Sequence, residues 1–184
     1  MSAGAKKRVA TRTPARARRG AKLEIDLAMP CAAWRKALPR VAQLVAAAAQ
    51  GALAQGGAKR AAAIEISIVL ADDQVVRGLN RRWRGKDSPT NVLSFASGEA
   101  ARAGRPLLLG DVVLAYETVA REAKAQGKPL ADHLRHLVTH GVLHLLGFDH
   151  VAEAEALRME RLERSVLARL GVPDPYHLRQ TADG

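Results

Sequence analysis

Four segments of the chain have the hydrophobic pattern of β-strands. Apolar and polar residues alternate in LEIDLA (23–28) and in AAIEISIVL (62–70), as they do in strands with one buried face. NVLSFA (91–96) predicts a third strand. LLLGDVVLA (107–115) is almost continuously apolar, which is typical of a strand buried on both faces, so we expect it near the centre of a sheet.

Between and after these strands, apolar residues recur at helical spacing. One helix is predicted after the first strand, and it is closed by Gly51 and the glycines at 56 and 57. Its apolar positions are Trp34, Leu38, Val41, Leu44, Val45 and Ala48. A short helix is predicted over 72–83, with Asp72 as its N-cap.

Three further helices complete the predicted chain. An amphipathic helix over 117–128 ends at Gly127, Pro129 starts the next helix, and a last helix covers 153–170. The predicted order is β-α-β-α-β-β-α-α-α. It indicates a single small α/β domain, with a mixed sheet of about four strands covered by helices.

The helix after Pro129 contains the strongest chemical signal. HGVLHLLGFDH (140–150) places His140, His144 and His150 in the frame of an extended zinc-protease motif, as in a zincin-like metal helix. Residues four apart lie on one helical face, so the first two imidazoles can reach one ion. His150 can join them only if the chain turns, and Gly147 allows that turn because glycine adopts the left-handed conformation freely.

Three histidine ligands are typical of zinc with a fourth position open to water, whose pKa zinc lowers to about 7. The catalytic Glu of the protease motif is replaced by Gly141. His136 lies one turn before His140, and it either orients a metal ligand or has a packing role. For His133 we expect a packing role. Asp149 either orients a ligand or water, or caps the turn.

The charge balance favours a polyanionic partner. The chain has 29 basic and 18 acidic residues, a net charge of +11. Nucleic acid is the first candidate for the partner, and an acidic membrane surface is the second. Much of the excess lies in residues 1–22, which lack acids and apolar periodicity, so we expect a disordered basic tail. This tail is either a solvated extension or an RNA-binding arm. A short C-terminal tail is expected over 178–184, which leaves a domain over 23–177.

The remaining composition favours a soluble protein of a reducing cytoplasm. Cys31 is the only cysteine, which excludes an intramolecular disulfide framework, and no segment is long and apolar enough to span a membrane. The start of the chain lacks the apolar core of a secretory signal, although its Arg-rich composition leaves a transit peptide open.

A second cluster of polar residues is LNRRWRGKDSPTNVLSF (79–95). Its basic run, Arg81, Arg82, Arg84 and Lys86, either grips phosphate in the bidentate manner of arginine or forms a solvated turn. The polar residues that follow, Thr90, Asn91 and Ser94, either hydrogen-bond a substrate backbone or cap the strand.

Together these motifs resemble the YbeY-type rRNA maturation factors, which are bacterial zinc-dependent endoribonucleases. The resemblance covers roughly residues 60–177 and rests on 79–95, on LGDVVLAYETVAREA (109–123), on HLRHLVTHGVLHLLGFDH (133–150) and on the closing GVPDPY. Ala96 stands where the family commonly has Pro, and Trp83 and Phe148 stand where Tyr is common.

The resemblance implies a small α/β fold and one zinc ion per chain on His140, His144 and His150, with Arg84 as the functional arginine. It implies cleavage of single-stranded RNA, maturation of the 16S rRNA 3′ end, and ribosome quality control. The implied partners are the 16S rRNA precursor, the ribosome or its small subunit, and a ribosomal protein or GTPase.

The leading hypothesis is therefore a metallo-endoribonuclease. Zinc-bound water, or a ribose 2′-OH near it, attacks phosphorus, while Arg84 shares the developing charge and Arg82 and Lys86 attract the RNA backbone. Asp111 and Asp149 are candidate bases. A non-catalytic assembly factor with structural zinc remains an alternative, as does a zinc protease, which the glycine at 141 disfavours.

Overall fold

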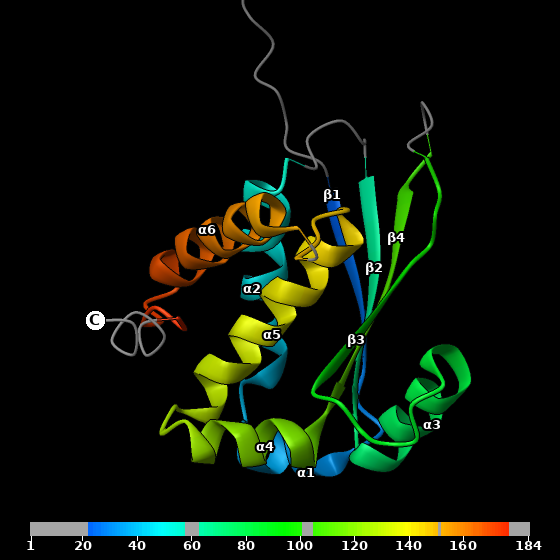
Figure 1. Cartoon of the computed structure of the whole chain (residues 1–184), viewed down its shortest axis with the longest axis vertical. Helices are drawn as coiled ribbons and strands as arrows, with labels where there is room; N and C mark the ends of the chain where they lie inside the picture. The colour runs from blue at the N-terminus through cyan, green and yellow to red at the C-terminus, as the bar shows by residue number, and fades with distance from the viewer. Residues whose placement is uncertain (1–21, 58–62, 101–104, 151, 177–184) are drawn as a thin grey trace, which may run out of the picture.

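The computed structural model describes residues 22–57, 63–100, 105–150 and 152–176. The sheet has four strands, and Figure 1 shows helices stacked against one of its faces. The strands are β1 (Lys22–Ala28), β2 (Ala63–Ala71), β3 (Val92–Ala96) and β4 (Leu107–Ala115). The helices are α1 (Ala32–Ala37), α2 (Val41–Gln55), α3 (Asp73–Arg84), α4 (Tyr116–Ala125), α5 (Leu130–Leu145) and α6 (Glu153–Arg169).

The sheet is mixed, as predicted. Its strand order is β1-β2-β4-β3, so the apolar strand β4 is internal, and β3 is an edge strand. β1 and β2 are parallel, as are β2 and β4, whereas β3 runs antiparallel to β4. Gly110 of β4 has φ of 130°, and a Cβ there would lie 2.0 Å from the carbonyl oxygen of Phe95. Glycine therefore permits the close pairing of β3 with β4.

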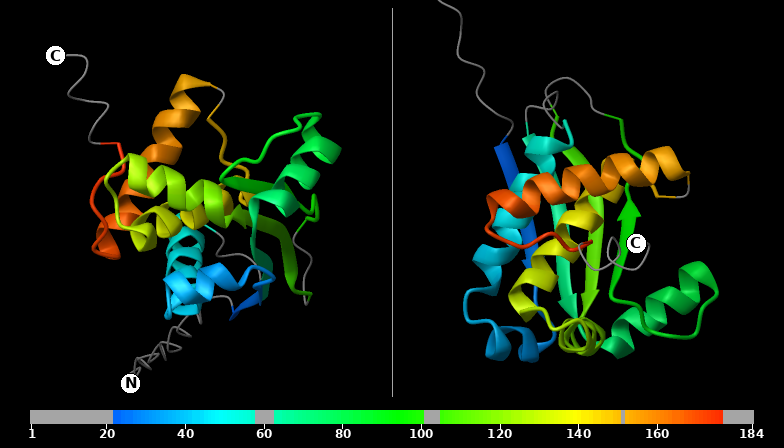
Figure 2. Two further views of the ribbon diagram at one scale, coloured as in Figure 1. Left: turned by 90° about the horizontal axis from the view of Figure 1, so that it is seen from below. Right: turned by 60° about the vertical axis from the view of Figure 1, so that its left-hand side comes forward.

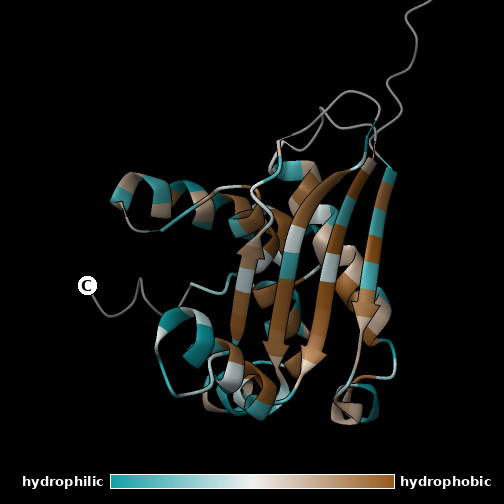
Figure 3. Ribbon diagram, turned by 90° about the vertical axis from the view of Figure 1, so that its right-hand side faces the viewer, coloured by the Kyte–Doolittle hydropathy of each residue, from teal (hydrophilic) through white to brown (hydrophobic). Residues whose placement is uncertain are grey.

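The main core lies between the sheet and the helices α2 and α5. α2 buries small side chains, including Ala48, Ala49 and Ala52, so its backbone approaches α5 closely. α6 crosses both helices (Figure 2). On the other face of the sheet, α3 lies at one end (Figure 3) and covers a smaller cluster that includes Val76, Leu93 and Val113.

One helix prediction was wrong. The segment expected to be a single helix before residue 51 forms α1 and α2, which are separated at Leu38 and Pro39. Proline disfavours helical backbone at the preceding residue, and this accounts for the break at Leu38. Gly51 does not end the helix: α2 continues to Gln55, and a Cβ at Gly51 would lie 2.8 Å from Cγ1 of Val166. This glycine is a point of close contact between α2 and α6.

The other elements agree with the sequence prediction to within a few residues. The Asp72 side chain accepts a hydrogen bond from the backbone N–H of Val75 and so caps α3. The predicted basic tail lies outside the described residues, except that Lys22 begins β1, and residues 178–184 also lie outside them. Within the described residues, no helix combines the length and apolar character needed to cross a membrane.

Candidate metal centre

His140 and His144 lie one turn apart near the C-terminal end of α5. Their ring centroids are 4.5 Å apart, and the two Nε2 atoms are separated by 3.1 Å. Burial lowers the pKa of His144, and the neighbouring His140 and His150 lower it further. A lowered pKa favours the neutral imidazole, which is the form that binds a metal.

The chain turns after α5 as the sequence predicts. Gly147 has φ of 87°, its N–H donates to the carbonyl of His144, and the N–H of Phe148 donates to the carbonyl of Leu143. This pair of bonds is a Schellman motif, which ends the helix and reverses the chain. His150 is thereby brought back, with its ring centroid 4.9 Å from that of His144.

The three histidines form a set that could hold a metal ion. One ring nitrogen from each lies within 4.8 Å of the other two. In a tetrahedral zinc site, two imidazole nitrogens at about 2.0–2.1 Å from the ion are about 3.3 Å apart, close to the 3.1 Å between His140 and His144. The donor set therefore fits zinc.

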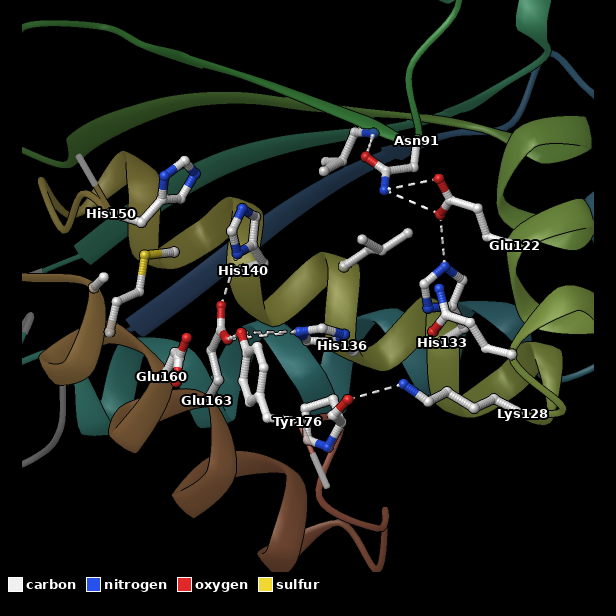
Figure 4. A pocket seen from close by; sticks show the side chains of 16 residues that line it. Asn91, Glu122, Lys128, His133, His136, His140, His150, Glu160, Glu163 and Tyr176 are labelled. Atoms are coloured by element: carbon white, nitrogen blue, oxygen red, sulfur yellow. Dashed lines mark hydrogen bonds and ion pairs between the residues drawn. The ribbon is translucent and has the colours of Figure 1, made fainter. Parts of the chain in front are cut away.

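A buried carboxylate holds the first of these histidines. Glu163 of α6 has a fully buried side chain, and its Oε1 accepts a hydrogen bond of 2.7 Å from Nδ1–H of His140 (Figure 4). With Nδ1 engaged, Nε2 of His140 faces His144. The other oxygen, Oε2, accepts from the Tyr176 hydroxyl, and Nε2 of His136 lies 3.5 Å from it.

Glu163 remains charged although it is buried. Burial raises its pKa, but the hydrogen bonds from His136 and His140 outweigh this effect and lower the pKa to about 2. The role of Glu163 was not predicted from the sequence. A signal was available, because this acid lies on the apolar stripe of α6 between Met159 and Val166.

The remaining histidine of α5, His133, lies in the first turn of the helix. His133 has a buried side chain, and its Nε2 is 2.8 Å from Oε2 of Glu122, which also accepts from the Asn91 side chain (Figure 4). This network joins α4, α5 and the start of β3. His136 lies between Glu163 and the three-histidine set: its Nε2 is 3.5 Å from Oε2 of Glu163, and its ring centroid is 6.4 Å from that of His140.

The structure gives a steric reason for glycine at 141. A Cβ at this position would lie 2.7 Å from Cγ1 of Val112 and 3.1 Å from Oγ of Ser94. Helix α5 therefore rests on β3 and β4 with no room for a side chain. A glutamate, the residue of the protease motif, does not fit this helix–sheet contact.

Arg84 and the three histidines line one cleft. Its lining also includes Thr90, Asn91, Ser94, Phe148 and Asp149. The loop before β3 is held in place by a bidentate ion pair between Arg77 and Asp87 and by a hydrogen bond from the Asn80 side chain to the carbonyl of Ser88. These contacts connect α3 to the loop that follows it, and Arg84, the last residue of α3, lines the cleft.

Several predicted site residues have structural partners or lie elsewhere. Oγ of Ser94 donates to the carbonyl of Gly141, and Asp149 accepts from the backbone N–H of His150. Arg82 and Lys86 are exposed near Arg84, and Asp111 is exposed on β4; none of these three is among the described residues that line the cleft.

Fold and site together define an α/β protein in which three histidines able to hold a metal share a cleft with an arginine. A family model described as Endoribonuclease YbeY matches residues 33–171. The "Endoribonuclease YbeY" of Paramagnetospirillum magneticum is 55% identical over 84% of this chain and 96% of its own. That of Methylocella silvestris is 52% identical over 87% and 90%. The chain belongs to the YbeY endoribonuclease family.

A solved structure supports the fold. The solution structure of TM1509 from Thermotoga maritima has a TM-score of 0.53 to this chain, at 18% identity, over 80% of this chain and 91% of its own.

Proposed function

We propose that this chain is a cytoplasmic, zinc-dependent, single-strand-specific endoribonuclease that matures the 3′ end of 16S rRNA and takes part in ribosome quality control. One observation supports the proposal most directly: Arg84 and the three histidines line the same cleft. Family membership supports an RNA substrate. The proposed partners are the 16S rRNA precursor, the small subunit, and a ribosomal protein or GTPase.

In this proposal, His140, His144 and His150 hold one zinc ion, and Glu163 fixes the ring of His140. Bound zinc supplies a Lewis acid and a source of hydroxide near neutral pH. Arg84 donates to the phosphoryl oxygens and stabilises the negative charge that develops there. Arg82 and Lys86 attract the RNA backbone, so binding weakens as salt rises.

The glycine at 141 weighs against the protease alternative. Zinc proteases of this motif use a Glu at this position, and here the sheet occupies the space that its side chain would need. The cleavage experiment tests the assembly-factor alternative, in which zinc is purely structural.

The experiment is cleavage of a single-stranded RNA containing the 16S 3′ end by zinc-loaded protein. We expect Arg84→Ala to cut about 100-fold more slowly, the usual effect of losing one charge-stabilising donor. Arg35→Ala, at an exposed position on α1 outside the cleft, is the matched control and should cut normally. His144→Ala should lose both zinc and activity while its circular dichroism spectrum is retained.

Equal cutting by all variants would overturn the assignment. Unfolding of His144→Ala, together with no cleavage by intact wild type, would favour structural zinc. A 2′-deoxy nucleotide at the cut site separates the two nucleophiles, because it abolishes only attack by the 2′-OH.

A further inference from the structure

The indole of Trp83 is unusually exposed. It is 62% exposed, the highest value among the large exposed hydrophobic side chains of the described residues; Leu157 follows at 49%. The chain's other tryptophan, Trp34, is fully buried and donates to the carbonyl of Ala71. Because most of the Trp83 indole lies outside the core, core packing does not explain a tryptophan at this position. A large aromatic surface exposed to water needs another explanation.

Trp83 has aromatic and cationic neighbours. The guanidinium of Arg82 lies 5.2 Å from the indole centroid, a cation–π distance, and the ring of Phe95 lies 6.2 Å away at 58°. Arg81, Arg84 and Lys86 are also exposed on this helix end and the following loop. The nearest acid in the sequence, Asp87, is already paired with Arg77. On the sheet side, the exposed Asp111 lies opposite Phe95 in the β3–β4 register. Against this one acid stand the exposed Arg81, Arg82, Arg84 and Lys86, so the net charge around the indole is positive.

Trp83 and Phe95, which together we call the aromatic platform, are next in sequence to residues of the candidate metal cleft. Arg84, the residue after Trp83, lines the cleft, as does Ser94, which precedes Phe95. Neighbouring residues of a strand point to opposite faces, so Phe95 lies on the α3 side of the edge strand β3 and Ser94 on the α5 side. Figure 1 shows α3 and β3 together at this edge of the sheet. The indole therefore lies across the edge strand β3 from the Ser94 side of the cleft.

We propose that Trp83, supported by Phe95, stacks an unpaired nucleobase of the RNA strand that leaves the cleft. This inference rests on the proposed endoribonuclease function. Every base has a π face, so such a platform binds single strands with little sequence preference, and the arginines beside it neutralise the flanking phosphates. The positive charge around the indole favours nucleic acid as its partner. A site for an apolar protein surface would be surrounded by uncharged groups instead.

Tryptophan fluorescence tests the platform directly. Because Trp34 is buried, a change in emission when RNA is added reports on Trp83. Stopped-flow mixing of zinc-loaded protein with single-stranded RNA should quench the emission before cleavage proceeds, and the amplitude at each RNA concentration gives the affinity. An RNA with one abasic nucleotide at the stacked position should bind with little quenching.

The variants give a second measure. Trp83→Ala should bind single-stranded RNA roughly 5- to 150-fold more weakly, the usual effect of losing one stacked base. It should raise KM far more than it lowers kcat. Trp83→Phe should retain most of the affinity, because the ring still stacks. Leu157→Ala removes another exposed apolar side chain, on α6, and should change neither value.

Three results would overturn the stacking proposal. The first is wild-type cleavage without quenching. The second is a Trp83→Ala variant that binds RNA as tightly as Leu157→Ala. The third is quenching that is insensitive to abasic nucleotides, because the emission would then change without base stacking. Failure of the proposed function looks different, since quenching would then occur without any cleavage by wild type.

Discussion

Replacing Glu163 by glutamine tests whether the buried carboxylate positions His140. The carboxylate accepts from Nδ1–H of His140 on one oxygen and from the Tyr176 hydroxyl on the other, with His136 at 3.5 Å. Glutamine has one accepting oxygen and an NH₂ group, so at least one buried donor must face another donor. An unsatisfied buried group costs about 1–3 kcal/mol, so Glu163→Gln should destabilise the metal-free protein by about that amount.

The same substitution should weaken metal binding. Loss of a group that orients a metal ligand typically reduces affinity by about 10- to 100-fold, which is about 1.4–2.7 kcal/mol. Competition with a chelating dye measures the affinity, and urea unfolding of the metal-free protein measures the stability. Nitrogen-15 NMR should find His140 protonated at Nδ1 in the wild type and in mixed tautomers in the variant.

Glu160→Gln is the matched control. Glu160 lies on the same helix and lines the same cavity as Glu163, but it pairs with Arg164 at 3.2 Å. Its loss should cost less than about 1 kcal/mol and leave metal affinity unchanged. A folded Glu163→Gln protein that binds zinc as tightly as this control would refute the positioning role. If Glu163→Gln does not fold, Tyr176→Phe, which keeps the carboxylate, should lose a smaller part of the affinity.

Two further predictions concern packing and pH. Gly141→Ala should destabilise the fold by about 1–3 kcal/mol in urea unfolding, because its Cβ meets Val112 at 2.7 Å; Gly78→Ala, in open space, should not. Burial raises the pKa of Glu122, but hydrogen bonds, chiefly that with His133, outweigh it and leave the pKa below 4.5. Glu122 therefore stabilises the fold above pH 4.5, and this contribution is lost as pH falls through the lowered pKa. Stability curves of wild type and Glu122→Gln should converge in acid; parallel curves would contradict this assignment.

The sequence predicted those features that local patterns encode. Alternation and apolar runs located the strands, and the almost continuous apolar pattern of β4 indicated its internal position. The spacing of the histidines, with Gly147 between the last two, was sufficient to bring three imidazoles together. Each of these signals lies within one segment of the chain.

Features that depend on contacts between distant segments were not predictable in this way. Glu163 follows several other acids on α6, and only its contact with His140 distinguishes it from them. Gly51 resembled a helix terminator, whereas its actual role depends on Val166. The break between α1 and α2 is different, because Pro39 was a local signal that the apolar periodicity obscured.

The distance in sequence between His140 and its carboxylate also has a consequence for synthesis. A growing chain has all three histidines once His150 has been added, but it still lacks α6 and the Tyr176 segment that follows. Until these pack across α5, the His140 ring lacks the hydrogen bond that Glu163 accepts from it. A product truncated after the histidine motif therefore contains the three candidate metal ligands but should hold zinc more weakly, and strong metal binding marks a chain that has been made and folded through α6 and Tyr176.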